Sequence, residues 1–259
     1  MKTARGIIHV HSTYSHDGRH TLEEIAGDAR MRGYRFVGMS EHSDSLSEEK
    51  MTEYVAACKR VSTPECVLIP GIEFTCNDNL HLVGLGVEHY TDKTDPVEVA
   101  AFIHHQNGVA IIAHPVRYNY RVPALVAGVV DGLEVWSAGY DGRFVPNDRS
   151  LRLVRELKQH RSSLLALCGE DLHRLRKHRH VVLTVAVHEV SSPGVLNALK
   201  ARNATMSNSW FLLHSMTGPG RLTLLAITAA RRFYLLAKEI RDLREQNSSA
   251  TSTSQEKTP

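Results

Sequence analysis

Short apolar segments rich in β-branched residues alternate with amphipathic segments from residue 6 to about residue 190. The apolar segments have the length of strands, which we expect at 7–11, 36–39, 66–72, 81–87, 109–113, 132–135, 163–167 and 181–187. Amphipathic segments between several of them predict helices at 21–33, 48–61, 96–105, 122–130 and 146–160. The first helix opens with the capping-box pattern Thr21-Leu-Glu-Glu24. This alternation predicts an α/β architecture with a largely parallel sheet, either open or closed as a barrel.

The pattern changes past about residue 205. Apolar residues three and four apart predict one stripe along a helix: Leu222, Leu225, Ala229, Phe233, Leu236, Ile240 and Leu243. The opposite side is mostly basic, with Arg231, Arg232, Lys238, Arg241 and Arg244. Such a helix either packs on the main domain or binds a partner or a membrane surface. We expect a main domain at 1–205, a helical segment at 206–246 and a disordered polar tail at 247–259.

Composition places the chain among soluble globular proteins. Of its 259 residues, 42% are hydrophobic and 23% charged, and no apolar run is long enough to span a membrane. The first residues lack the apolar core of a signal peptide, and the four cysteines form no CxxC pair, so we expect reduced thiols and a cytoplasmic protein. A net charge of 31 − 28 = +3 is too small to indicate a nucleic-acid binder.

Sixteen histidines are a heavy load for this length, and several stand where predicted strands end. His9 and His11 lie two residues apart on a predicted strand, so their imidazoles should point to the same face. The polar turn after that strand carries Asp17, placed to fold back toward it. Taken singly, each of these residues is better explained as a surface loop residue or a partner in a core hydrogen bond than as a ligand.

Residues of metal-ligand type also mark other predicted strands. They occur in Ser40-Glu-His42, Pro70-Gly-Ile-Glu73, His81, Ala113-His114 and Gly169-Glu-Asp-Leu-His173. In a parallel barrel the strand exits share one rim, where such enzymes keep their chemistry. The recurrence therefore predicts one site. Imidazole and carboxylate donors without thiolate suit Zn²⁺, Mn²⁺ or Fe²⁺.

In this order, the motifs resemble those of the PHP (polymerase and histidinol phosphatase) superfamily of metal-dependent phosphoesterases. The HxHSxxS(H)DG motif corresponds to His9-Val-His-Ser-Thr-Tyr-Ser-His-Asp-Gly18, and the (T/S)(D/E)H motif to Ser40-Glu-His42. The glutamate, HP and GxDxH motifs correspond to Gly71-Ile-Glu73, His114-Pro115 and Gly169-Glu-Asp-Leu-His173. The resemblance covers roughly residues 7–190. It implies a distorted (β/α)7 TIM-like barrel with two or three metals at its rim and an appended C-terminal helix.

The resemblance also implies a set of ligands. Two histidines and two carboxylates bind one metal: His9, His11, Glu73 and Asp171. Glu73 bridges to a second metal, which His114 also binds. A third metal is held by Asp17, His42 and His173. His81 is implied as a ligand or substrate contact, and Arg117 as a phosphate clamp, because a guanidinium meets phosphate oxygens two at a time.

The implied activity is hydrolysis of a phosphomonoester or nucleotide by a hydroxide that two or three divalent ions activate. His42 or His173 would protonate the leaving alcohol if the third metal is absent. Two residues depart from the usual motifs: Glu41 replaces the commoner Asp, and Glu170 stands where a small residue is usual. We expect Glu170 to orient a ligand histidine, or else to make the site more acidic. His16 is expected to face solvent.

A basic run, His173-Arg-Leu-Arg-Lys-His-Arg-His180, follows the last motif. It is either a solvated loop or a surface that attracts a polyanion. The expected partner is a small phosphorylated substrate or a nucleotide, with nucleic acid as the alternative. Two other functions stay open: an exonuclease acting on short oligonucleotides, and a regulatory module that binds metal without hydrolysis.

Overall fold

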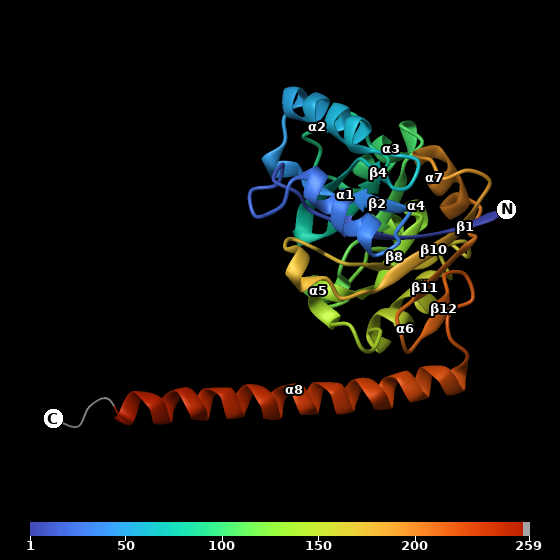
Figure 1. Cartoon of the computed structure of the whole chain (residues 1–259). Coiled ribbons are helices and arrows are strands. Elements are labelled where there is room, and N and C mark those ends of the chain that lie inside the picture. The colour runs from blue at the N-terminus through green and yellow to red at the C-terminus, as the bar shows by residue number, and fades with distance from the viewer. Residues whose placement is uncertain (256–259) are drawn as a thin grey trace.

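The computed structural model describes the backbone of residues 1–255 and the side chains of residues 1–241. Its strands form two six-stranded sheets in a mixed α/β fold (Figure 1). The first sheet has the order β12 (Leu212–His214), β11 (Ala204–Ser207), β10 (Val182–Val187), β1 (Lys2–Val10), β2 (Phe36–Met39) and β4 (Val67–Ile69). The second has the order β3 (Glu41–His42), β5 (Gly71–Thr75), β6 (His81–Leu85), β7 (Val109–Ile112), β8 (Gly132–Ser137) and β9 (Leu165–Gly169).

The helices lie where the amphipathic pattern predicts them. They are α1 (Leu22–Met31), α2 (Glu48–Val61), α3 (Pro96–His105), α4 (Ala124–Val129) and α6 (Asp148–Leu157). Thr21 and Glu24 form the predicted capping box at the start of α1. The sequence analysis did not predict α5 (Ala138–Asp141), α7 (Ser192–Lys200), β11 or β12.

Parallel pairing does not dominate as expected. Alongside parallel pairs such as β1–β2 and β8–β9, the pairs β1–β10, β5–β6, β6–β7, β10–β11 and β11–β12 are antiparallel. Only residues 76–80 join β5 to β6, which is too short for a crossover between parallel strands. Elsewhere the apolar pattern of a buried strand carries no information on its direction.

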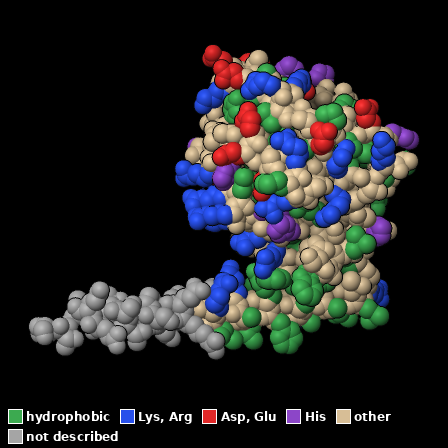
Figure 2. Space-filling view, in the orientation of Figure 1, with side chains coloured by type: hydrophobic (Ala, Val, Ile, Leu, Met, Phe, Trp, Pro, Cys, Tyr) green, Lys and Arg blue, Asp and Glu red, His purple; other side chains and the backbone are tan. Residues whose placement is uncertain are grey.

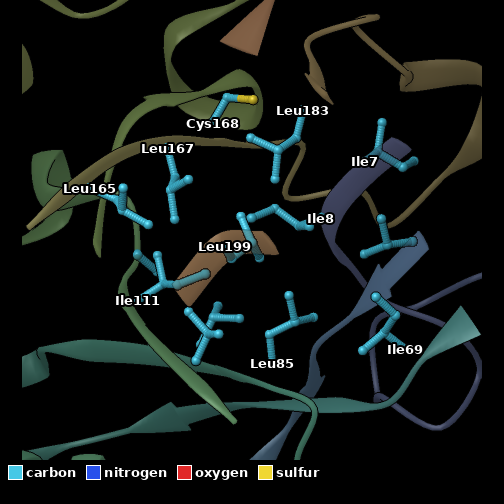
Figure 3. Close-up of a cluster of buried hydrophobic side chains, with 14 of the residues drawn as sticks. Ile7, Ile8, Ile69, Leu85, Ile111, Leu165, Leu167, Cys168, Leu183 and Leu199 are labelled. Carbon is cyan, nitrogen blue, oxygen red and sulfur yellow. The ribbon is translucent and has the colours of Figure 1, made fainter. Parts of the chain in front are cut away.

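Aliphatic side chains from both sheets fill the space between them. Ile8 of β1, Leu85 of β6 and Ile111 of β7 point toward one another in a buried cluster that also contains Leu199 of α7 (Figure 3). All four cysteines are buried free thiols, as the absence of a CxxC pair predicts. This core holds the strand ends in fixed positions, and the residues of interest lie at those ends.

The C-terminal helix α8 (Arg221–Gln255) packs on the domain through the face opposite to the one expected. Leu224 and Ile227 are buried, whereas Leu222 and Phe233 of the predicted stripe are 82% and 74% exposed. The helix therefore packs on the domain, which is one of the two alternatives, but the stripe takes no part in that contact. A polar contact explains this orientation of the helix. Buried Asp141 pairs with Arg231, so the side of α8 that carries Arg231 faces the domain.

The boundaries expected near the C-terminus also shift. Residues 206–220 contain β12 and the end of β11, so helix begins only at Arg221. The helix then continues to Gln255 through most of the segment expected to be disordered, because no glycine or proline interrupts it. Residues 256–259 of that expected tail lie outside the described residues. Among the helices the structure describes, none is long and apolar enough to cross a membrane.

Candidate metal centre

The first two histidines converge because the backbone of β1 is irregular. Ile8 pairs with Gly38 and Val10 with Met39, so His9 is an extra, bulged residue with a φ of 65°. Strict strand alternation predicted that His9 and His11 share a face. The two rings do converge, with centroids 5.2 Å apart. The direction of the His9 side chain, however, is set by the bulge and not by regular strand alternation. His114 and Asp171 also have positive φ, at 22° and 48°, so local backbone strain is concentrated at this site.

The first cluster comprises His9, His11, Glu73 and Asp171. Glu73 Oε2 lies 3.4 Å from His9 Nε2 and 3.5 Å from His11 Nε2. Asp171 Oδ1 lies 3.6 Å from each of the same two nitrogens. Ligand atoms about 2.1 Å from a tetrahedral metal are separated by about 3.4 Å, so these spacings fit one ion.

Unpartnered nitrogens support the same interpretation. His9 Nε2 and His11 Nε2 are buried, and neither has a hydrogen-bond partner within the described residues. A buried polar atom without a partner is unfavourable unless another group satisfies it. A divalent cation would satisfy both nitrogens at once, so these residues fit the group that the donor set indicates.

The second cluster comprises Glu73, His81 and His114. Glu73 Oε1 lies 2.7 Å from His81 Nδ1 and 2.8 Å from His114 Nε2. The two oxygens of one buried carboxylate thus face two different groups of histidines. This is the arrangement of a carboxylate that could bridge two ions, and both contacts of Oε1 have hydrogen-bond length.

The third cluster comprises Asp17, His42 and His173 and lies nearer the surface. Asp17 Oδ1 is 3.3 Å from His42 Nε2, and Asp17 Oδ2 is 3.0 Å from His173 Nε2. His42 also approaches Glu73 Oε2 at 3.1 Å, which joins this cluster to the first. The side chain of His16 is 60% exposed and faces solvent, as expected.

The structure adds one residue that the sequence analysis did not single out. Glu134 of β8 is buried, and its Oε1 lies 2.7 Å from His9 Nδ1 while its Oε2 accepts from the backbone N–H of His114. Gly169 makes room for it, because a Cβ at Gly169 would collide with Glu134 Oε1. The available signal was an acidic residue inside the apolar segment Leu-Glu-Val-Trp136.

Glu41 supports the turn between the first two histidines and Asp17. Its carboxylate accepts hydrogen bonds from the backbone N–H and hydroxyl of Ser12 and from the hydroxyl of Ser15. Ser15 Oγ in turn accepts from the backbone N–H of His42. Glu41, which replaces the usual Asp, therefore lies beside the site and holds the turn of residues 12–18 in place.

Glu170 does not orient a ligand histidine, which corrects the expectation. Its carboxylate accepts the backbone N–H groups of Arg179 at 2.9 Å and Val181 at 2.8 Å. Burial raises the pKa of Glu170 to about 7, although these two hydrogen bonds oppose the shift. Glu170 thus fixes the basic loop, defined as residues 173–180, beside the third cluster. Three basic side chains of this loop are exposed: Arg176, Lys177 and Arg179.

Arg117 stands at the rim of the second cluster. It lies in the 3-10 turn Pro115–Tyr118, directly after His114, and its side chain is exposed. It interacts with the hydroxyl of Tyr140, whose ring centroid lies 5.0 Å from that of His114. Trp136 is buried in the core.

The charges of the site favour ionised carboxylates. Burial disfavours a charge on Glu73, but His9, His114 and His42 outweigh it and hold its pKa well below the usual range. Burial likewise opposes protonation of His9, yet Glu134 and Glu73 raise its pKa well above the usual value. Burial lowers the pKa of His11 to about 4, so its imidazole is neutral and can donate a lone pair.

An α/β scaffold with a rim of histidines and carboxylates is typical of metal-dependent hydrolases. The PHP domain family model matches residues 8–175, well over half of the chain, and the chain belongs to the PHP domain family. No curated protein matches the sequence.

Several solved structures share the fold. A two-domain protein with a predicted PHP-like metal-dependent phosphoesterase from Bacteroides vulgatus ATCC 8482 has a TM-score of 0.59 and 16% identity over 89% of this chain and 70% of its own. PsfC from Pseudomonas syringae PB-5123 has a TM-score of 0.60 and 12% identity over 92% and 99%. The lesion-specific endonuclease PfuEndoQ from Pyrococcus furiosus has a TM-score of 0.52 and 16% identity over 77% and 56%. At these identities the likeness concerns the fold.

Proposed function

We propose that this protein is a metal-dependent phosphoesterase that hydrolyses a small phosphomonoester or a nucleotide at a di- or trinuclear site. The observation that carries the proposal is Glu73, whose two buried oxygens face separate histidine pairs. We assign the first metal to the first cluster, the second to the second cluster and the third to the third cluster. Zn²⁺, Mn²⁺ and Fe²⁺ all suit these donors.

Bound divalent ions would supply a Lewis acid for phosphoryl oxygens and ease the loss of a proton from water. The chain itself supplies orientation and protons. Arg117 is placed to bind the non-bridging oxygens of a phosphate, because its guanidinium extends from the rim beside His114. His173 and His42 are partly exposed and share Asp17, so either could hold a proton near a leaving alcohol when no third ion occupies that cluster.

A pocket lined in part by Arg117, and by none of the proposed metal ligands, is large enough for the leaving group of a nucleotide. It has a volume of about 950 Å³ and is lined by Asn79, Arg117, Tyr120 and Arg121, among others. Asn79 precedes His81 by two residues, and Arg117 follows His114 by three, so both walls of the pocket continue from ligand strands. The pocket could hold the leaving group while Arg117 holds the phosphate.

We also propose that the two sheets are the halves of the family's distorted (β/α)7 barrel. Only residue 40 separates β2 from β3, and only residue 70 separates β4 from β5, so the chain passes directly from one sheet to the other. On the other side, Val10 forms a parallel bridge with Leu172, which follows β9.

The test measures metal content and hydrolysis together on the full chain. Wild type should contain two or three divalent ions per chain by plasma mass spectrometry and should hydrolyse p-nitrophenyl phosphate or a member of a nucleotide panel. Glu73→Gln should lose the two ions that the carboxylate would join, and with them nearly all turnover. The control Glu49→Gln, at the exposed start of α2, should keep its metal content and its turnover. A fully metal-loaded wild type without phosphoesterase activity would instead favour the regulatory binding module.

The basic loop favours a second candidate, a nuclease. Its exposed Arg176, Lys177 and Arg179 lie beside the third cluster, and basic side chains gather at this edge of the domain (Figure 2). Endonuclease Q, which shares the fold, has been solved with a 27-mer duplex substrate. Cleavage of an oligonucleotide that weakens steeply with salt, and less steeply in Arg176→Ala, would select this candidate over a monoesterase.

A further inference from the structure

The exposed stripe of α8 is an apolar feature that the proposed activity leaves unexplained. On the described part of the helix it consists of Leu222, Leu225, Ala229, Phe233, Leu236 and Ile240. Four of its large side chains are 53% to 82% exposed: Leu222, Leu225, Phe233 and Leu236. Figure 2 shows apolar side chains along the side of α8 that faces away from the domain. A contiguous apolar patch of this kind marks an interaction surface.

From this face we propose that α8 pairs antiparallel with α8 of a second copy of this chain. The stripe is nearly symmetric about position 231. Leu222 and Ile240 lie nine residues to either side, and Ala229 and Phe233 lie two residues to either side. Leu225 and Leu236, six and five residues away, complete the pattern. When two such helices run antiparallel, each large side chain therefore meets an apolar partner, and Phe233 meets the small Ala229.

Charges at the edge of the stripe agree with this pairing. Arg221 and Glu239 are 18 residues apart, a whole number of helical turns, so they lie on the same edge of the helix. In an antiparallel pair related by a two-fold axis, one edge contains the same residues from both copies, running in opposite directions. Arg221 of one copy then lies near Glu239 of the other, twice per dimer. Arg232 lies on the same edge near the two-fold axis, so it faces Arg232 of the other copy. The repulsion between these two charges limits the affinity of the dimer.

The geometry of the domain leaves room for a second copy. Leu224, Ile227 and Arg231 face the domain and are buried, so the stripe points away from it. A second helix on the stripe would place its own domain on the far side of the pair, and the two domains would not collide. Spacings of three, four and four residues keep the stripe on one side of a nearly straight helix.

A membrane surface is the rival occupant. Helices that lie on membranes carry Lys and Arg on the polar face opposite the apolar one, where these side chains reach lipid headgroups. Here the opposite face is occupied by the protein's own domain, and Arg231 on it is bound to Asp141. The self-complementary order of apolar residues, and the acidic Glu239 at their edge, have a use in a dimer and none on an anionic membrane.

Sedimentation velocity on the full chain tests the proposal. We expect a concentration-dependent species of twice the chain mass of 28.9 kDa. Leu225→Glu and Phe233→Glu should each abolish it, whereas Leu125→Glu, at a side chain 79% exposed on α4, should not. Arg221→Glu and Glu239→Arg should each weaken the dimer, and their combination should restore it.

Cross-linking tests the orientation, since all four native cysteines are buried. A mixture of Ala229→Cys and Phe233→Cys chains should form a disulfide-linked heterodimer, and neither variant alone should cross-link as readily. Efficient cross-linking of Ala229→Cys with itself would overturn the antiparallel arrangement. A monomer at all concentrations, or a monomer that binds phosphatidylserine vesicles through the stripe, would overturn the dimer.

Discussion

Glu134 contacts two of the histidines that we propose as metal ligands. Its Oε1 lies within hydrogen-bond distance of His9 Nδ1, and its Oε2 accepts a hydrogen bond from the backbone N–H of His114. Glu134 thereby fixes two histidines that belong to different clusters. A carboxylate behind a ligand histidine sets its orientation and raises its basicity. Since Glu134 is buried and has no place in the ligand set itself, its role is one of positioning.

We expect Glu134→Gln to lower metal affinity about 10- to 100-fold while the fold is kept, because the amide has the same shape but no charge. Chelator competition on the full chain measures the affinity, and circular dichroism checks the fold. The exposed Glu49→Gln is the matched control. Unchanged affinity in Glu134→Gln would mean that His9 needs no carboxylate behind it.

At the scale of elements, α8 is joined to the site by a buried ion pair. Arg231 Nη2 lies 2.7 Å from Asp141 Oδ1, and Arg231 Nη1 donates to the carbonyl of Val145. Asp141 ends α5, the turn that also carries Tyr140 and Gly139; a Cβ at Gly139 would crowd Asp171. Asp141 thus joins α8 to the segment that packs against Asp171.

Removal of either partner of this pair should destabilise the protein strongly. We expect Arg231→Met to lower the free energy of unfolding by about 3 to 5 kcal/mol, because it leaves the Asp141 carboxylate buried without its cation. Arg231→Met combined with Asp141→Asn should lose less than the single variant, since the uncompensated charge is gone. Urea unfolding of both variants decides the point. Equal losses would show that the helix depends on packing at Leu224 and Ile227 instead.

At the scale of the whole molecule, a buried histidine in the basic loop should make stability sensitive to acid. Burial, together with the positive charges of His180 and Arg32, lowers the pKa of His178 to about 3. In the unfolded chain its pKa is about 6.5, so below that pH the unfolded state binds a proton that the folded state does not. Stability is therefore full above about pH 6.5 and is lost progressively as the pH falls toward 3.

Between about pH 6.5 and pH 5 the unfolding free energy of wild type should fall as His178 of the unfolded chain takes up a proton. We expect this fall to be smaller by about 1 to 2 kcal/mol in His178→Phe. Urea unfolding of the metal-free chain at each pH measures this, and the slope against pH is compared rather than the absolute stability. The exposed His105→Phe is the control and should leave the slope unchanged. A wild-type slope in His178→Phe would show that other groups carry the acid sensitivity.

Most of the elements of the main domain, and a proposed set of site residues, could be predicted from local sequence patterns. Strand and helix positions follow from apolar periodicity, which is local, and the strand ends carried His9, His11, Glu73, His114 and Asp171 in a recognisable order. Their side chains do meet in the structure. Local patterns suffice here because each ligand lies at the end of a strand, and the core fixes where strands end.

The directions of these side chains, and the surfaces that stay exposed, follow from contacts between distant parts of the chain. The bulge at His9 and the approach of Glu134 depend on pairing between strands distant in sequence. The burial of Arg231, and with it the exposure of Phe233, depends on Asp141, ninety residues earlier in the chain. An amphipathic pattern shows that a helix has an apolar face, but the partner of that face is chosen by contacts the pattern does not contain.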